Sequence, residues 1–219
     1  MMRHDSRSTG RRTLRRLAIK GSFVAVPWLP ARSQITTATD PTAPIRRLDD
    51  ALLAAMRSGQ GTPFARRFAD LTPVIEQTFD LDAVLAVSVD LDWPTLPDDQ
   101  KPAPRTAFLR YTVASYAANF NSYPGQVFQI SPTVRGVGDG RVLVYTKIVP
   151  ADGSQHSLDY VMRNGPSGWK AVDVLEEGSI SRVAVQRSDF RQLLDSEGLP
   201  ALTTALRQKV VTLSGGMLA

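Results

Sequence analysis

The sequence contains no cysteine and only two histidines, His4 and His156, among its 219 residues. Without cysteine the chain has no disulfide, no thiolate nucleophile and no cysteine-ligated zinc site. The absence of cysteine does not exclude an oxidising compartment, because a domain of this length buries enough apolar surface to fold without disulfides. If the N-terminus is removed as a signal, only His156 is left for a catalytic triad or a metal site. It follows the Asp152-Gly153 turn, a position typical of a solvated histidine.

Two common catalytic signatures are also missing. No G-x-S-x-G nucleophile elbow occurs in the chain. The segment from Gly136 to Gly140 (GVGDG) is similar to a phosphate-binding loop. However, it lies between two predicted strands and does not precede a helix, so it lacks the anion site of a helix N-terminus. We interpret it as a hairpin turn.

The excess of positive over negative charge lies entirely in the N-terminal segment. The formal net charge is +5, yet residues 1–33 contain eight Lys and Arg against the single acid Asp5. The other 186 residues therefore carry eighteen basic and twenty acidic side chains. This distribution argues against a nucleic-acid-binding globular domain, which concentrates basic residues on its folded surface.

Residues 1–33 have the order of an export signal. A basic segment (residues 11–16, RRTLRR) precedes an apolar stretch (21–29) and the small-residue site Ala31-Arg32-Ser33. The apolar stretch is far shorter than the roughly 20 residues that span a bilayer. Arg11-Arg12 also fits a twin-arginine signal, which tolerates the interrupting Lys20 better than a general secretory signal does. We predict export, followed by a flexible lead-in over residues 34–43; the alternative is a basic arm that binds membrane or nucleic acid.

Helical periodicity dominates the chain from Pro44 to Ser122. Apolar residues recur at helical spacing from Ile45 to Met56, and Gly59 ends the run. Thr72-Pro73 has the form of an N-cap followed by a first-turn proline, so we expect separate helices before and after it. Further helices are predicted at about 80–87 and 105–122, the latter after a proline-broken stretch.

Turn signals with alternating apolar segments dominate from Gln126 onwards. Asp139-Gly140, Asp152-Gly153 and Asn164-Gly165 separate predicted strands at about 126–135, 141–150, 155–163 and 169–176. A helical tail follows from about 182 to 213. The fold class is therefore α+β: N-terminal helices and a long helix packed on a four-stranded antiparallel meander, with a C-terminal helical tail. We expect one domain over residues 44–213 and a short tail over 214–219.

Turn geometry also predicts which side chains share a sheet face. A two-residue turn at Asp152-Gly153 places Tyr145 opposite Tyr160, and a turn that brings Arg163 opposite Trp169 places Tyr160 opposite Val172 and Asp159 opposite Asp173. This face and the helices enclose an apolar pocket only if the sheet and the long helix do not close completely, because each residue taken singly fits plain core better. The candidate lining residues of this pocket are Phe79, Leu109, Val113, Tyr116, Phe120, Val134, Leu143, Tyr145, Leu158, Tyr160, Met162, Val172 and Val174.

Asp159 and Asp173 are the most interesting polar pair. Two facing carboxylates split their pKa values and can perform general acid–base chemistry. Alternatively, one or both form ion pairs with Arg163, Arg182 or Arg187. We favour an ion pair between Asp173 and Arg187 that fixes the last strand to the tail helix.

Short segments between Pro44 and Leu213 occur in a recognisable order. They are Phe79-Asp80, Trp93 with Leu96 and Gln100, Tyr116, Leu158-Asp159-Tyr160, 169–174 (WKAVDV), 178–183 (GSISRV), 186–190 (QRSDF) and Leu193-Leu194. In this order the chain resembles the MlaC-like, toluene-tolerance type family of periplasmic phospholipid-binding proteins. Residues 111–114 (YTVA), 179–190 and 213–216 (LSGG) are most similar to its hopanoid-biosynthesis-associated branch, HpnM. Pro102 and Pro104 depart from the family pattern and put the start of the long helix in question.

The resemblance implies a soluble periplasmic lipid carrier. Such a protein encloses a phospholipid or hopanoid-type lipid and passes it between an inner-membrane ABC-type transport complex and an outer-membrane partner. It needs no cofactor, metal or catalytic residue. Two rival classes stay open: a small enzyme that uses Asp159 and Asp173 on an apolar substrate, and a non-catalytic scaffold of a membrane lipid complex.

Overall fold

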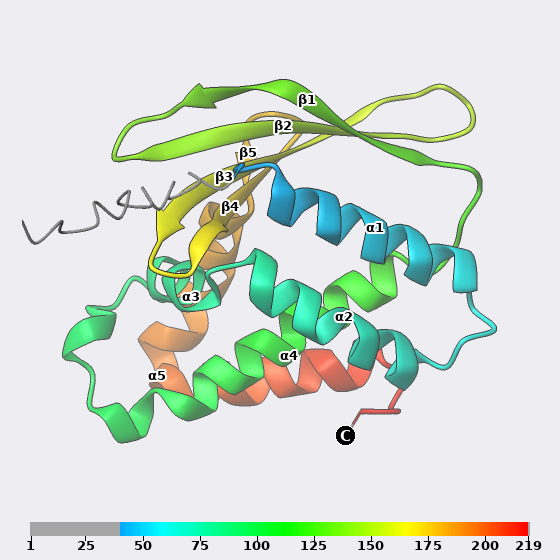
Figure 1. The fold of residues 1–219 in the computed structure, drawn as a ribbon. Coiled ribbons are helices and arrows are strands. Elements are labelled where there is room, and N and C mark those ends of the chain that lie inside the picture. The colour runs from blue at the N-terminus through cyan, green and yellow to red at the C-terminus, as the bar shows by residue number, and fades with distance from the viewer. Residues whose placement is uncertain (1–39, 219) are drawn as a thin grey trace, which may run out of the picture. The chain divides into compact units, whose positions relative to one another are not determined.

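The computed structural model describes residues 40–218, arranged as a curved sheet packed on a layer of helices (Figure 1). The predicted export signal and residues 34–39 of the predicted lead-in lie outside these residues. Three helices come first: α1 (Ala43–Ser58), α2 (Phe64–Thr78) and α3 (Leu81–Val89). Two short 3-10 turns, Trp93–Thr95 and Asp98–Gln100, lead into α4 (Pro102–Asn119). Among the residues the structure describes, no helix has the length and apolar character needed to cross a membrane.

Two helices contain prolines at which the sequence predicted a break or left the start of the helix open. The predicted break at Thr72-Pro73 is wrong, since α2 continues through Pro73. The hydroxyl of Thr72 donates to the carbonyl of Phe68 at 2.8 Å within this turn. In α4, Pro102 and Pro104 occupy the first turn, where backbone N–H groups have no helical partner and proline is tolerated. The long helix therefore begins at Pro102, before the predicted start at about residue 105, and the two prolines do not shorten it.

The sheet has five antiparallel strands, one more than predicted, in the order β1-β2-β3-β4-β5. The strands are β1 (Val127–Gly136), β2 (Arg141–Val149), β3 (His156–Gly165), β4 (Gly168–Glu176) and β5 (Ile180–Ser181). The first four confirm the predicted meander. β5 contains only two residues, too few to give a periodic pattern, and it runs directly into α5 (Arg182–Leu213).

The predicted register is wrong by one residue between β2 and β3. Val144 pairs with Tyr160, which puts Tyr145 on the opposite face of the sheet. The connection is longer than the predicted two-residue turn, because the last cross-strand pair is Ile148 with His156, and a β-turn closed by the bond from the Gly153 amide to the Pro150 carbonyl lies between them. Between β3 and β4, Tyr160 pairs with Val174, and an irregularity at Val161/Met162 leaves Val172 without a paired residue.

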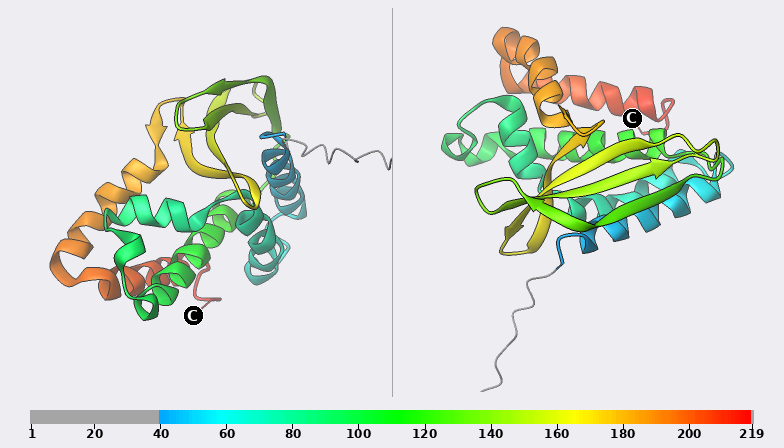
Figure 2. Two further views of the ribbon diagram at one scale, coloured as in Figure 1. Left: turned by 60° about the vertical axis from the view of Figure 1, so that its left-hand side comes forward. Right: turned by 90° about the horizontal axis from the view of Figure 1, so that it is seen from above.

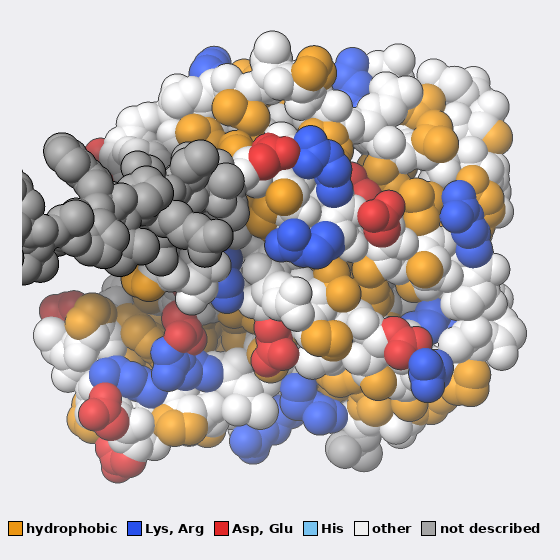
Figure 3. All heavy atoms as spheres, viewed as in Figure 1, with side chains coloured by type: hydrophobic (Ala, Val, Ile, Leu, Met, Phe, Trp, Pro, Cys, Tyr) orange, Lys and Arg blue, Asp and Glu red, His pale blue; other side chains and the backbone are white. Residues whose placement is uncertain are grey.

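The helices form two apolar clusters with α4 at their boundary. One cluster joins α1, α2 and α4 to the inner face of the sheet, and the other joins α3, α4 and α5. The helix α5 is kinked at Gly198, whose φ of 71° and following Pro200 change its direction (Figure 2). On the face shown in Figure 3, acidic and basic side chains are interspersed, as the sequence-wide charge distribution predicts for the folded part.

Candidate functional site

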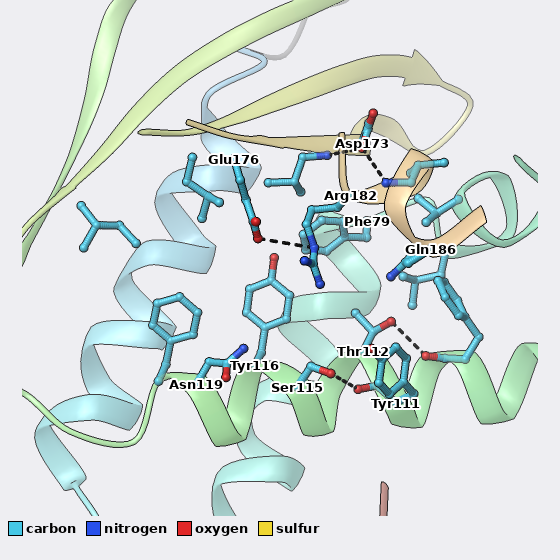
Figure 4. A pocket seen from close by; sticks show the side chains of 18 residues that line it. Phe79, Tyr111, Thr112, Ser115, Tyr116, Asn119, Asp173, Glu176, Arg182 and Gln186 are labelled. Carbon is cyan, nitrogen blue, oxygen red and sulfur yellow. Dashed lines mark hydrogen bonds and ion pairs between the residues drawn. The ribbon is translucent and has the colours of Figure 1, made fainter. Parts of the chain in front are cut away.

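A pocket of about 250 Å³ lies where α4, the sheet and the start of α5 meet (Figure 4). Its walls come from α3, α4, β2, β3, β4 and the first turns of α5. The lining is largely apolar, with Phe79, Leu81, Val84, Phe108, Phe120, Ile148, Leu158, Val174 and Val183. A concave apolar site with a few polar groups is typical of a small-molecule pocket.

One face of α4 forms a wall of the pocket. Thr112, Ser115 and Asn119 line it at a spacing of three to four residues. The hydroxyl of Thr112 donates to the carbonyl of Phe108 and that of Ser115 to the carbonyl of Tyr111, both at 2.9 Å. Because these donors are satisfied within the helix, this wall is less polar than its sequence suggests.

A row of aromatic rings separates the pocket from the core beneath α1. The ring of Tyr116 lies 5.8 Å from that of Phe79 and stacks on Phe120 at 5.8 Å. Phe120 in turn contacts Phe128 at 6.1 Å, and Phe79 lies 6.3 Å from the buried Tyr160. Burial raises the pKa of Tyr116 far above its ordinary value, so this phenol stays neutral at physiological pH.

Three charged residues line the pocket: Asp173, Glu176 and Arg182. Asp173 accepts hydrogen bonds from the Ser181 hydroxyl at 2.6 Å, the Val174 amide at 2.8 Å and the Val183 amide at 3.1 Å. These bonds hold β4 to the start of α5. Glu176 faces Arg182, with 3.4 Å between Oε1 and Nε.

The predicted ion pair between Asp173 and Arg187 is wrong. Arg187 pairs with Asp90 at the C-terminus of α3, and Asp173 is bound by the β5–α5 junction instead. The prediction joined Asp173 to the correct helix but missed β5. The short strand brings the N-terminus of α5, and not its second turn, to Asp173.

The proposed carboxylate pair does not form either. Asp159 pairs across the sheet with Leu175, and Asp173 pairs with Val161. Asp159 is buried and accepts the Thr146 amide at 3.0 Å, and this burial raises its pKa. The two aspartates are not cross-strand partners, and each has its own hydrogen-bond donors: Thr146 for Asp159 and the β5–α5 junction for Asp173, so the geometry gives no shared acid–base site.

Five of the predicted pocket residues line the cavity: Phe79, Tyr116, Phe120, Leu158 and Val174. The others lie elsewhere. Val113, Tyr160 and Met162 are fully buried in the core beneath α1, and Leu109 packs against that core. The remaining four, Val134, Leu143, Tyr145 and Val172, are sheet residues outside the pocket lining.

Sequence reasoning missed the contributions of α3 and α5 to the pocket. Leu81, Val84, Val183 and Gln186 come from helices whose position relative to α4 depends on the tertiary fold. For α4 the sequence did contain an indication of the cavity. Phe108 and Tyr111 widen the helix's apolar stripe, which runs through Leu109, Val113 and Tyr116, toward the face that lines the cavity.

A second hollow, of about 440 Å³, lies between the start of α1, the end of α2 and the β3–β4 turn. Its lining is mixed, with Asp40, Arg47, Glu76 and Lys170 beside Trp169. Across residues 40–218, no group of three or more histidines and carboxylates is placed to hold a metal ion.

The family model described as "MlaC protein" matches residues 46–208. Among solved structures, the fold is similar to that of a phospholipid-binding protein from Ralstonia solanacearum, solved in complex with a phospholipid. The two chains are 19% identical, the similarity covers 80% of this chain and 99% of that chain, and the TM-score is 0.68. A comparison with curated proteins finds no match.

Proposed function

The chain belongs to the MlaC family, and from this premise we propose that it is a carrier that encloses the acyl part of a lipid in the pocket described above. The observation that carries this proposal is the apolar pocket between the sheet, α4 and α5. Transfer of a lipid through water requires burial of its apolar surface, which is worth about 0.8 kcal/mol per CH₂ group. The Ralstonia protein of the same fold was solved with a phospholipid, which supports a lipid as ligand.

The pocket volume indicates how much lipid it takes in this conformation. An apolar cavity of about 150 Å³ is sufficient for benzene, so a cavity of about 250 Å³ holds part of one acyl chain. A complete diacyl lipid therefore requires that a wall move. The row formed by Tyr116, Phe120 and Phe128 is the wall we expect to move, because its rings are only partly buried.

We extend the proposal to the compartment and the partners. The chain would act in the periplasm, exported by the signal predicted over residues 1–33, and would pass its lipid between an inner-membrane ABC-type complex and an outer-membrane partner. Its cargo would be a phospholipid or a hopanoid-type lipid. The order of sequence segments, the basic N-terminus and the family membership support this assignment.

Native mass spectrometry of the mature protein purified from its own host tests the carrier function. We expect a discrete adduct that organic extraction identifies as a phospholipid or a hopanoid. Ser115→Trp places an indole in the pocket and should reduce the bound lipid at least tenfold, because the side chain occupies the space of the acyl chain.

Ser196→Trp is the matched control, since Ser196 is an exposed serine of α5 outside the pocket lining. It should keep the adduct. A wild-type protein that is free of lipid and also refuses added lipid would contradict the carrier function. Equal loading of the two tryptophan variants would contradict the assignment of the pocket.

A further inference from the structure

We propose that the pocket recognises a zwitterionic lipid headgroup, with Arg182 binding its phosphate and Glu176 binding its primary ammonium. This inference rests on the proposed carrier function and specifies its ligand. It concerns the only two charged side chains of the pocket lining that no hydrogen bond holds within the described part of the chain.

Glu176 and Arg182 form a loose pair. The 3.4 Å between Oε1 and Nε exceeds an ordinary charge-assisted hydrogen bond, and the side chains are 44% and 43% exposed. Such a pair contributes little to stability, so a ligand can displace it at small cost. Figure 4 shows the Glu176 carboxylate, the Arg182 guanidinium and the Tyr116 hydroxyl pointing toward one another.

Asp173, the third charged residue of the pocket, has a structural role. Its oxygens accept three hydrogen bonds, from Ser181, Val174 and Val183, all at 3.1 Å or less. A ligand cannot compete for Asp173 without detaching β4 from α5. The charges available to a ligand are therefore one cation and one anion, side by side.

This arrangement distinguishes between headgroups by charge. A guanidinium binds phosphate through two parallel N–H donors, and a carboxylate accepts hydrogen bonds from an ammonium group. An anionic headgroup without a cation would bring its phosphate next to Glu176, where the like charges repel. A headgroup with both a phosphate and an ammonium satisfies both side chains.

The apolar lining continues directly from the charged pair. Leu158 is the cross-strand partner of Glu176, and Val174 lies two residues earlier on the same strand. Phe79 and Val84, which are 5% and 7% exposed, add buried apolar surface to the same lining. A headgroup held at Glu176 and Arg182 would thus leave its acyl chain directed along apolar side chains.

Competition between two lipids tests the assignment. The lipid-free full chain is incubated with vesicles of equimolar phosphatidylethanolamine and phosphatidylglycerol with identical acyl chains, and the bound lipids are quantified by mass spectrometry. We expect phosphatidylethanolamine to be enriched about fivefold, the effect of one partly exposed charge pair. Glu176→Gln should bring the ratio of the two lipids to one or below, and Arg182→Gln should lower the binding of both.

Two substitutions control for charge and folding. Glu177→Gln removes the same charge one residue further on, where the side chain faces His156 outside the pocket, and should keep the wild-type ratio. Arg187→Gln removes a cation from the same helix and should keep the binding of both lipids. A wild-type ratio of one, or a preference that Glu176→Gln retains, would overturn the headgroup assignment alone. Failure to bind either lipid would instead overturn the phospholipid cargo on which this assignment rests, and the native mass spectrum described above would then decide the carrier function.

Discussion

The inner face of the sheet is covered in two different ways. Beneath α1 the packing is closed, and Ile45, Leu48 and Leu52 are completely buried. Toward α3 and α5 it stays open, and Phe120 and Leu158 are only partly buried around the pocket. Both regions use the same kinds of apolar side chains. The difference is that α1 presents a regular stripe to the sheet, whereas α3 is short and α5 meets the sheet with its N-terminus.

The closed region contains an exception at its centre. Asp49 of α1 is 5% exposed, and neither of its carboxylate oxygens has a hydrogen-bond partner within residues 40–218. Burial, followed by the charge of Asp50, raises the pKa of Asp49 to about 7. Burial, followed by the neighbouring Tyr116 and by Asp49, also raises the pKa of Tyr160, which is completely buried in the same cluster. The closed half of the sheet is therefore packed more tightly but carries an unsatisfied polar group.

The largest expected effect comes from removing this carboxyl. Because the folded-state pKa lies above the ordinary value of 3.8, the folded chain holds the proton more strongly than the unfolded chain. The contribution of Asp49 to stability therefore falls as the pH rises from about 4 to about 7, by on the order of 4 kcal/mol, and is constant above that range. Asp49→Asn should stabilise the protein at pH 8 and have little effect at pH 4, as measured by urea unfolding.

Asp50→Asn is the matched control for this pH dependence. Asp50 is the exposed neighbour of Asp49 on α1 and the smaller of the two causes of its raised pKa, so its substitution should change stability only slightly at pH 4 and by much less than Asp49→Asn at pH 8. An Asp49→Asn effect that is equal at pH 4 and pH 8 would show that burial of the ionised carboxylate is not its cause.

Truncation of one apolar side chain in each region compares the closed and the open packing directly. Leu48→Ala removes a completely buried side chain and should cost about 3 kcal/mol of unfolding free energy. Phe120→Ala removes a larger side chain, but should cost only about 1 kcal/mol because its ring is partly exposed beside an existing cavity. Urea unfolding of both variants at one pH checks this. If Phe120→Ala costs as much as Leu48→Ala, the two regions are equally well packed.

The smallest expected effect belongs to the ion pair between α3 and α5. Arg187 and Asp90 are 42% and 56% exposed, so Arg187→Gln should lower the unfolding free energy by less than about 0.5 kcal/mol. High salt should reduce even this difference. A loss above 2 kcal/mol in the same urea experiment would mean that the pair, and not apolar packing, fixes α5 to the open side of the sheet.

Local sequence patterns predicted the elements because their causes are local. The apolar spacing of residues 45–56 and Gly59 at φ 64° determine where α1 lies and where it ends. The Asp-Gly and Asn-Gly pairs determined the order of four strands. The failures have local causes as well. A two-residue strand has too few residues to show periodicity. The connection between β2 and β3 is longer than predicted, and the resulting shift of one residue pairs Val144, in place of Tyr145, with Tyr160.

The candidate site shows the limit of this approach. Phe79, Tyr116 and Phe120 could be predicted because they lie on regular apolar stripes and face the sheet. Glu176, Arg182 and Gln186 could not, because the β5–α5 junction that brings them to the pocket is formed by the bonds of Asp173. The same bonds explain why the predicted partner of Arg187 is wrong.

The sequence by itself determined the α+β class, the order of helices and strands, the confinement of positive charge to the N-terminus and the absence of cysteine chemistry. Only the tertiary structure decided the register, which aromatic residues face a cavity, and which charged residues accompany them. Periodicity, turns and composition act over a few residues and are therefore visible in the chain. A pocket is the space left between α3, α4, α5 and the sheet, and it depends on how well these separate segments fill the volume between them.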